Sequence, residues 1–243
     1  MPESFTPSEQ GRVAAMFGRI APGYDQANRI LSFGVDALWR RRLVRDVDAS
    51  FAPGSRRRVL DLAAGTCDVS LALARSIPGV EVLAVDFCLP MLKAGKAKIE
   101  KAGACAMRRI VPLAGDGLCL PFGEGCVDAV TISFGLRNME PRAHALAEAH
   151  RVLAPGGTFH ILEFGSSKGR IWGGLYNLYL TRILPFLGGL IAGDREAYRY
   201  LARTIGNFPE ADVLCTELLN AGFSSVSAAR LWGGIVFLHT ARK

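Results

Sequence analysis

The sequence predicts an α/β fold: a doubly wound, mostly parallel seven-stranded sheet of Rossmann-like type, with N-terminal helices and an antiparallel C-terminal hairpin. Two patterns predict it. Between residues 58 and 164, short apolar runs rich in strand formers alternate with helical segments, which is typical of parallel strands joined by helices on both faces. Residues 223–242 hold two more apolar runs separated by Trp232-Gly233, which indicates an antiparallel hairpin.

The composition favours one folded domain over residues 1–243. Half of the 243 residues are hydrophobic and 21% are charged, so enough apolar surface is available to offset chain entropy, and a disordered chain is excluded. The length suits one large domain rather than two. No targeting segment is visible and the six cysteines form no C-x-x-C pair. We therefore expect a cytoplasmic protein without a metal site or a disulfide scaffold.

Along the chain, the sequence predicts N-terminal helices, followed by the strands and helices of the sheet. Residues 12–48 have the pattern of helices packed outside the sheet as a lid, broken at Pro22-Gly23 and near Gly34. Residues 58–164 form the expected cofactor-binding core, in which apolar runs end at turns rich in Gly and Pro. The expected strands cover 58–63, 80–87, 110–115, 127–134 and 158–164, and the expected helices cover 68–75, 90–102 and 142–153.

An apolar insertion, residues 165–209, follows the core. Its stretch 171–192 is long enough to span a bilayer, but it contains Arg182 and Pro185, and a charge at the bilayer centre is costly. We therefore expect broken apolar helices that cap a pocket or rest on a membrane surface. Residues 210–243 then supply a closing helix and the hairpin.

The first strand–turn–helix unit carries the chemistry. The turn in V-L-D-L-A-A-G-T-C-D (59–68) lets backbone approach a ligand, and Asp86 ends the next strand, where an acidic side chain accepts hydrogen bonds from ribose hydroxyls. A dinucleotide site needs G-x-G-x-x-G, whereas here Gly65 stands alone, Asp68 follows, and a P-loop lysine is absent. These features disfavour an NAD-dependent dehydrogenase. They favour an adenosine ligand with a cationic end, such as S-adenosylmethionine.

Several motifs resemble known methyltransferases. The D-x-A-x-G-T turn, the acidic end of the second strand, G-D-G-L-C-L-P-F (115–122) and P-G-G (155–157) resemble the class I S-adenosylmethionine-dependent methyltransferases. Three narrower stretches resemble the quinone C-methyltransferases, which methylate demethylmenaquinol or a ubiquinol precursor. These stretches are F-G-R-I-A-P-G-Y-D (17–25) with N-R-I-L-S-F-G-V-D-A-L-W-R-R (28–41), I-S-F-G-L-R-N (132–138) and Y-R-Y-L-A-R-T-I (198–205).

The resemblance implies a set of cofactor-binding residues. Asp86 would hold the ribose diol, Asp116 would accept a hydrogen bond from the adenine amino group, and Asp61 with the turn backbone would face the methionine end. The alternative for Asp61 and Asp68 is a helix cap or a loop hydrogen bond. The full implied set is Asp61, Gly65, Thr66, Asp86, Asp116, Gly117 and Ser133.

One residue departs from the family. The family usually has Gly after the threonine of this turn, and this chain has Cys67. A side chain at that position is expected to narrow the methionine pocket, with a modest loss of cofactor affinity or a shifted backbone. Cys67 is not interpreted as a nucleophile.

The acceptor side follows from what C-methylation of a hydroquinone requires. The site must stabilise a phenolate, and a cation near the hydroxyl favours the ionised form. We therefore predict Arg137 as the main catalytic residue with Asn138 as its hydrogen-bonding partner. Other catalytic candidates, left open as base or as pocket wall, are Tyr24, Asp25, Tyr198, Arg199, Tyr200 and His239.

The expected partner is a polyprenyl hydroquinone. Met91, Met107 and Met139 are candidates to line a tunnel for its tail, although apolar residues at such spacing usually belong to a core. Because this substrate lives in the bilayer, the apolar insertion and a formal charge of +4 on each of residues 1–58 and 165–243 predict peripheral association with the inner face of the membrane.

Other functions stay open at this point. A nucleic-acid methyltransferase would carry an N-P-P-Y-type tetrapeptide, which is absent, so no nucleic-acid partner is expected. A methyltransferase for another phenolic or lipid substrate and an inactive membrane-docking module remain alternatives, as does a homo-oligomer. The sequence does not distinguish a naphthoquinol ring from a benzoquinol ring, and it does not indicate the length of the prenyl tail.

Overall fold

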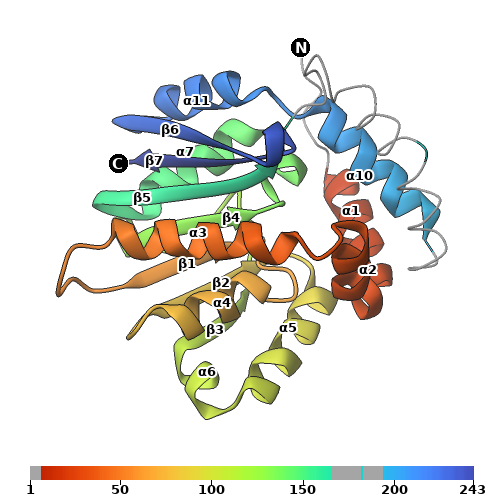
Figure 1. The fold of residues 1–243 in the computed structure, drawn as a ribbon, viewed down its shortest axis with the longest axis horizontal. Helices are drawn as coiled ribbons and strands as arrows, with labels where there is room; N and C mark the ends of the chain where they lie inside the picture. Colours follow the sequence, from red (N-terminus) through yellow and green to blue (C-terminus); the bar gives the residue numbers. More distant parts are fainter. Residues whose placement is uncertain (1–6, 166–181, 183–193) are drawn as a thin grey trace.

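A computed structural model describes residues 7–165, Arg182 and residues 194–243 of the chain. One seven-stranded sheet crosses it, in the order β3-β2-β1-β4-β5-β7-β6 (Figure 1). Strands β1 to β5 pair in parallel, and β7 pairs antiparallel with both β5 and β6. The strands are β1 Arg58–Leu62, β2 Glu81–Asp86, β3 Ile110–Ala114, β4 Val127–Ser133, β5 Leu153–Phe164, β6 Ser225–Leu231 and β7 Val236–Arg242. The predicted fold class is confirmed.

Helices cover both faces of the sheet (Figure 1). Residues of α3, α4, α5 and α6 share one buried apolar cluster with the sheet, whereas α7 and α11 contribute to a second cluster. The helices are α1 Pro7–Ile20, α2 Tyr24–Leu31, α3 Asp36–Ser50, α4 Asp68–Ser76, α5 Leu89–Ala102, α6 Ala104–Arg109, α7 Arg142–Val152, α10 Arg195–Asn207 and α11 Ala211–Asn220, with short 3₁₀ turns η1 Ala21–Gly23, η2 Leu136–Asn138 and η4 Trp232–Gly234.

Two elements differ from the sequence-based expectation. Helix α6 was not expected, because it has only six residues and buries Ala106 alone, which leaves no apolar stripe to detect. Strand β5 begins at Leu153, five residues before the predicted start. Its early part pairs with Val127 of β4 before the register shifts. Pro155-Gly156-Gly157 therefore lies within a strand, at an irregularity of the ladder.

The N-terminal helices pack against α10 near the carboxyl ends of the parallel strands (Figure 1). Met16, Ile20 and Leu31 of α1 and α2 form one buried cluster with Tyr198 and Ile205 of α10. The chain breaks at η1 and again between α2 and α3, as the sequence predicts. These segments therefore stand where a ligand of a doubly wound sheet binds.

The structure describes only part of the predicted insertion, residues 165–209. Helix α10 occupies its last third, and it is amphipathic rather than wholly apolar. The stretch 171–192 lies outside the described residues, apart from Arg182, so its predicted role stays a prediction. Among the residues that the structure describes, no helix combines the length and apolarity needed to cross a membrane.

Candidate active site

Two adjoining cavities open over the carboxyl ends of the parallel strands. The larger cavity has a volume of about 700 Å³ and the smaller cavity about 300 Å³. Both are lined by Phe17 and Tyr24 of the N-terminal helices, by Gly65 of the first turn and by Ser133 and Asn138 beyond β4. The shared wall indicates one site with two compartments.

Asp86 anchors the first turn to the end of β2. Its Oδ2 accepts a hydrogen bond from the Gly65 backbone N–H at 2.8 Å, and its Oδ1 accepts one from the Cys88 N–H at 2.7 Å. Burial raises the pKa of Asp86, and the two backbone hydrogen bonds oppose that shift. A carboxylate has about four acceptor positions, so Asp86 can still accept hydrogen bonds from a ligand in the smaller cavity.

The smaller cavity gathers most of the predicted cofactor residues. Asp86, Asp116, Gly117 and Ser133 all line it, together with Gly65. A side chain at Gly117 would bring its Cβ within 2.7 Å of Met139 Cε, so glycine keeps this space open. The buried Oδ1 of Asn138, on the same wall, has no hydrogen-bond partner among the described residues. Acidic acceptors, glycine-lined space and an unpaired acceptor fit a nucleoside such as that of S-adenosylmethionine.

Asp61 and Thr66 face the larger cavity instead. Asp61 is fully buried, accepts hydrogen bonds from the hydroxyls of Ser70 and, at 3.1 Å, Thr131, and has a pKa that burial raises to about 6. Thr66 Oγ1 donates to Asp25 Oδ1 at 2.6 Å. Hydrogen bonds within the protein thus occupy much of the acceptor capacity of Asp61. A structural hydrogen bond is the alternative role that the sequence left open for this residue.

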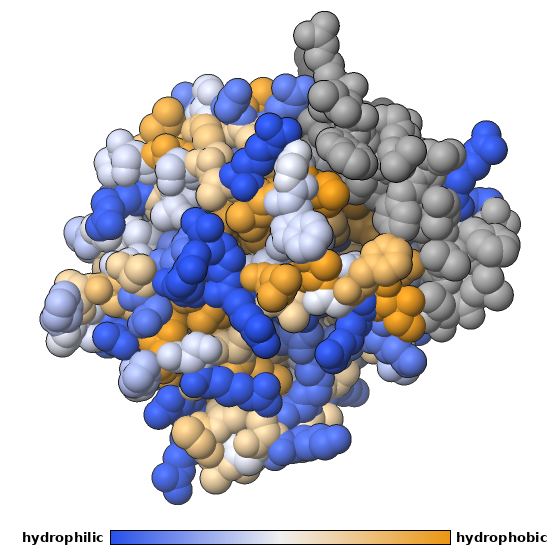
Figure 2. All heavy atoms as spheres, in the orientation of Figure 1, coloured by the Kyte–Doolittle hydropathy of each residue, from blue (hydrophilic) through white to orange (hydrophobic). Residues whose placement is uncertain are grey.

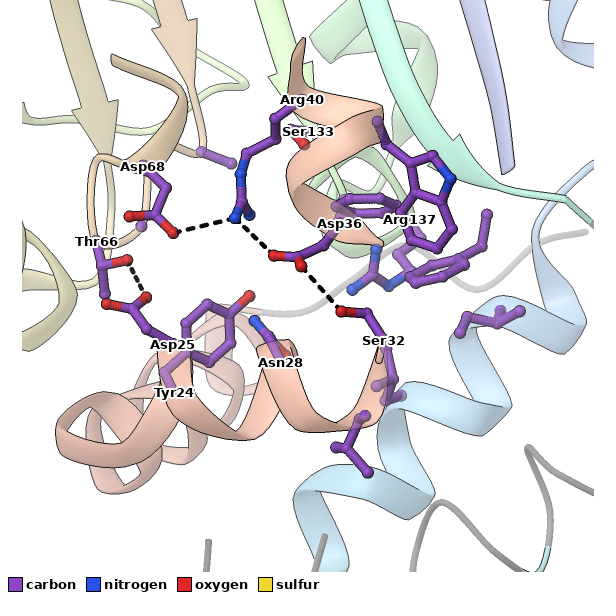
Figure 3. A pocket seen from close by; sticks show the side chains of 18 of the residues that line it. Tyr24, Asp25, Asn28, Ser32, Asp36, Arg40, Thr66, Asp68, Ser133 and Arg137 are labelled. Atoms are coloured by element: carbon purple, nitrogen blue, oxygen red, sulfur yellow. Dashed lines mark hydrogen bonds and ion pairs between the residues drawn. The ribbon is translucent and has the colours of Figure 1, made fainter. Parts of the chain in front are cut away.

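A charged network that the sequence did not reveal joins the lid to the first turn (Figure 3). Lys98 of α5 binds Asp25 at 2.7 Å and also binds Asp68. Arg40 of α3 bridges Asp36 at 2.6 Å and Asp68 at 3.6 Å. Charged residues on amphipathic helices are ordinarily solvated, so only the folded arrangement shows that these ones bring together the four helices α2, α3, α4 and α5.

Cys67 does not narrow either cavity. It lies in the left-handed region at φ 61° and is fully buried. Its side chain packs against Gly95 of α5, where a Cβ would come within 2.5 Å of Cys67 Sγ. The expected narrowing of the methionine pocket is therefore wrong, because α5 has a glycine where the sulfur needs room. Burial also raises the pKa of the thiol to about 12, which keeps Cys67 protonated and unreactive.

The Cys67–Gly95 contact supports a stability prediction. Gly95→Ala should lower the free energy of unfolding by about 1–3 kcal/mol, because the new methyl group collides with Cys67 Sγ. Cys67→Gly should restore part of that loss in the double variant, since it removes the sulfur and suits the left-handed backbone, while the Thr66 backbone carbon stays within 3.1 Å of the new methyl group. Urea unfolding of the four proteins of this cycle measures the coupling. Additive losses would contradict the contact.

Arg137 and Asn138 reach the site on η2, just beyond β4. Arg137 lines the larger cavity, and Asn138 lines both. Arg137 Nη1 donates to Glu163 Oε1 of β5 at 2.7 Å. The sequence does not point to Glu163, because an acidic residue within a strand pattern does not indicate which residue it will pair with.

The predicted tyrosines also surround the larger cavity. Tyr24, Tyr198 and Tyr200 all line it. Burial raises the pKa of Tyr24, with Arg137 opposing, and burial raises the pKa of Tyr198 to about 12. Both phenols therefore keep their protons at neutral pH, so they suit hydrogen-bond donation or packing better than a role as base.

Other candidates lie elsewhere. His239 of β7 is buried with its Nε2 3.3 Å from the Ala211 carbonyl oxygen, and it lines neither cavity. Arg199 is exposed and lines neither. Met91 and Met139 line the smaller cavity rather than the larger one, and Met107 is half exposed on α6. The aromatic residues of 171–186, which the sequence also offers as lining for a tunnel that holds the polyprenyl tail, lie outside the described residues, so this tunnel stays a prediction.

The wall of the larger cavity is mostly apolar, and Figure 2 shows apolar side chains gathered in the middle of this face. Part of this wall is an aromatic group, comprising Trp39, Phe134 and Phe164, whose rings pack against one another. Within the part of the chain that the structure describes, no three His, Cys, Asp or Glu side chains gather as metal ligands. The site thus combines a smaller cavity, which two acidic side chains line, with a larger and mostly apolar one.

Comparison with known proteins gives the family. The model of the ubiE/COQ5 methyltransferase family matches residues 5–243. A demethylmenaquinone methyltransferase of Thermus thermophilus is 46% identical over 224 residues, which are 92% of this chain and 98% of the relative. A ubiquinone/menaquinone biosynthesis C-methyltransferase of Citrifermentans bemidjiense is 39% identical over 97% of this chain and 98% of its own.

A solved structure supports the fold. An S-adenosylmethionine-dependent methyltransferase of Thermotoga maritima matches with a TM-score of 0.64 and 14% identity, over 94% of this chain and 98% of that one. At that identity the likeness concerns the fold alone. Together with the matches in sequence, the two-compartment site leads to one conclusion: the chain belongs to the ubiE/COQ5 methyltransferase family, and its methyl donor is S-adenosylmethionine.

Proposed function

We propose that this enzyme methylates a ring carbon of demethylmenaquinol, a polyprenylated hydroquinone, to give menaquinol. One observation carries the proposal: a mostly apolar cavity of about 700 Å³ presents Arg137 in its wall and adjoins the smaller cavity that Asp86 and Asp116 line. The name of the relative from Thermus thermophilus supports the naphthoquinol ring. A ubiquinol precursor is the second candidate, because the name of the relative from Citrifermentans bemidjiense includes both quinones.

The smaller cavity would hold the nucleoside of the cofactor, which supplies an electrophilic methyl group on its sulfonium. Asp86 would accept hydrogen bonds from the ribose hydroxyls, and Asp116 would accept one from the adenine amino group. Gly65 and Gly117 leave room for it, and Ser133 completes the wall. Asp61 and Thr66, which line the larger cavity, would meet the methionine end.

The larger cavity would hold the acceptor ring. Arg137 donates a hydrogen bond to the acceptor oxygen and favours its ionised form. Electron density passes from this oxygen into the ring as the ring carbon takes the methyl group, the sulfonium leaves as a neutral thioether, and the ring proton is then lost to water. Asn138 orients the same hydroxyl, and the phenols of Tyr24 and Tyr200 form the wall around the ring. The apolar lining excludes water and fixes the ring against the adjoining compartment, and such positioning supplies much of the rate.

The direct test is methyl transfer. Purified protein is incubated with methyl-labelled S-adenosylmethionine and a panel of reduced quinones in detergent, with and without chelator. We expect label in menaquinol, at an unchanged rate in chelator. Transfer to a benzoquinol alone would assign the other ring, and transfer to neither would refute the proposal.

We further propose that the mouth of the larger cavity docks on an anionic membrane, from which the polyprenyl tail enters. Phe33 is 82% exposed and Trp232 56% exposed, and both line this cavity. Both occupy the left-handed backbone region, which costs bulky residues about 1–2 kcal/mol. Arg29 is exposed beside Phe33, and Arg230 binds the Gly233 carbonyl oxygen beside Trp232. Exposed aromatics flanked by cations suit an anionic lipid surface.

Vesicle binding tests the membrane proposal. Wild-type protein should bind anionic vesicles more tightly than neutral ones, and high salt should release it, because surface charges are screened within about 8 Å at physiological ionic strength. The double variant Phe33→Ser with Trp232→Ser should reduce sedimentation with vesicles about tenfold or more. The matched control, Met107→Ser with Leu219→Ser, removes two exposed apolar residues of other helices and should bind as wild type. Equal binding by both variants would contradict the proposal.

A further inference from the structure

Two neighbouring strands bring opposite charges together beneath the larger cavity. Arg137 follows β4 and Glu163 lies near the end of β5, which runs parallel to β4 with Leu162 opposite Ser133. Arg137 Nη1 donates to Glu163 Oε1 at 2.7 Å. The two side chains are only 5% and 1% exposed. This is a buried ion pair at the ligand-binding edge of the sheet.

The protein itself uses the Glu163 carboxylate. Its Oε1 also accepts a hydrogen bond from the Phe164 N–H at 2.9 Å, and its Oε2 accepts one from the Arg137 N–H at 3.4 Å. Glu163 lines neither cavity, whereas Arg137 lines the larger one. Any effect of Glu163 on a ligand must therefore pass through Arg137.

Arg137, by contrast, is incompletely paired. Its Nε is buried and has no hydrogen-bond partner among the described residues. The guanidinium carbon lies 5.6 Å from the centroid of the Phe164 ring, and Figure 3 shows the group facing the same space as Tyr24 and Asn28. A buried ion pair offsets its desolvation only when its remaining donors are satisfied. The unpaired Nε therefore points to a ligand.

We propose that Glu163 is a positioning residue for methyl transfer, which aims Arg137 at the acceptor hydroxyl and balances the guanidinium charge there. The identity of the acceptor rests on the proposed function. The guanidinium favours the ionised hydroxyl, which is the form that pushes electron density into the ring carbon. Glu163 fixes the direction of the guanidinium toward that hydroxyl and moderates its charge, so that the ring is held in the orientation that methyl transfer needs.

Other ionisable groups act on the same hydroxyl from the walls of the larger cavity. They come from α2, α3, β1, the start of α4 and α10. They are unchanged in the variants below, so differences between variants isolate Glu163. These groups are Tyr24, Asp25, Asp36, Arg40, Asp61, Asp68, Tyr198 and Tyr200.

A spectroscopic probe tests the charge balance without any turnover. The probe is para-nitrophenol, a phenol whose ionised form absorbs visible light, titrated with pH in the presence of the protein. Glu163→Gln removes the negative charge and keeps the shape, so the pKa of the bound probe should fall by about one to two units. The control, Glu217→Gln, alters the ion pair with Arg142, which lies away from both cavities, and should leave the probe unchanged.

Glu163→Asp separates orientation from charge. It keeps the charge but shortens the reach to Arg137, so the bound probe should titrate as in wild type while kcat for methyl transfer falls about tenfold or more. In Glu163→Gln, the acidic limb of the kcat/KM profile should move to lower pH. Calorimetric binding of S-adenosylmethionine should stay within about threefold of wild type in both variants, which shows that they fold.

Two results would overturn the role of Glu163. The first is an unchanged probe titration in Glu163→Gln, and the second is wild-type kcat in Glu163→Asp. Failure of the proposed function has a different signature, because wild-type protein would then transfer no methyl group to any quinol while the probe still responded to Glu163→Gln.

Discussion

Turnover should fall about 100- to 1,000-fold when Arg137→Met is added to the Glu163→Gln variant. Arg137 is the only cation on η2, and its unpaired Nε is a buried donor in the wall of the apolar compartment. Removing the cation that favours the ionised acceptor hydroxyl should lower kcat far more than it weakens binding of the cofactor, which Arg137 does not hold. Steady-state kinetics with demethylmenaquinol measure the first effect, and calorimetric titration with S-adenosylmethionine measures the second.

The paired substitution is needed because Arg137 is buried with its partner. Removing Arg137 alone would leave the Glu163 carboxylate without its cation, which costs about 3–5 kcal/mol and would confuse unfolding with lost catalysis. Replacing both charges with neutral groups of similar size avoids that cost. If cofactor affinity and turnover fall equally relative to Glu163→Gln, Arg137 is structural. If turnover persists, the role passes to Tyr24 or Tyr200.

Affinity for S-adenosylmethionine should fall about 5- to 150-fold in Asp86→Ala, which corresponds to 1–3 kcal/mol for lost hydrogen bonds to a charged acceptor. The structure adds a second cause, because the same carboxylate holds the Gly65 N–H of the turn. Asp86→Asn keeps one acceptor oxygen and should lose less. Calorimetric titration of the folded variants measures the change.

A matched aspartate provides the control for Asp86. Asp128 stands near the start of β4, at the opposite end of the sheet, where it accepts hydrogen bonds from the Arg58 N–H at 2.9 Å and from Arg56. Asp128→Ala should lower stability and leave cofactor affinity unchanged. Unchanged affinity in Asp86→Ala would remove Asp86 from the ribose site.

The sequence predicts the sheet well because its signals are local. Most parallel strands are apolar runs that end at a turn with Gly or Pro, and the turns after β1, β2 and β3 line the smaller cavity. Gly65, Asp86, Asp116 and Gly117 therefore share one cavity, and their role toward the cofactor stays a prediction. The β5 boundary failed because Pro155 and its neighbouring glycines have the composition of a turn, while the backbone pairing that extends the strand to Leu153 depends on β4.

Partnerships between distant residues were not predictable in the same way. Glu163, Lys98 and Arg40 gain their roles from side chains far away in the sequence, and no local pattern announces the contact. The opposite error concerns His239, which is chemically suited to act as a base but lies between β7 and α11. Residue type suggests chemistry, whereas only the packing of helices against the sheet decides which residues share a cavity.

The contact between Cys67 and Gly95 also restricts the evolutionary history of this turn. The family resemblance implies that position 67 usually holds a glycine, where this chain has a cysteine. A glycine at position 67 would give position 95 more room, although a Cβ added there would still lie 3.1 Å from the Thr66 backbone carbon, whereas the cysteine sulfur leaves only 2.5 Å. The cost of alanine at position 95 therefore depends on the residue at position 67.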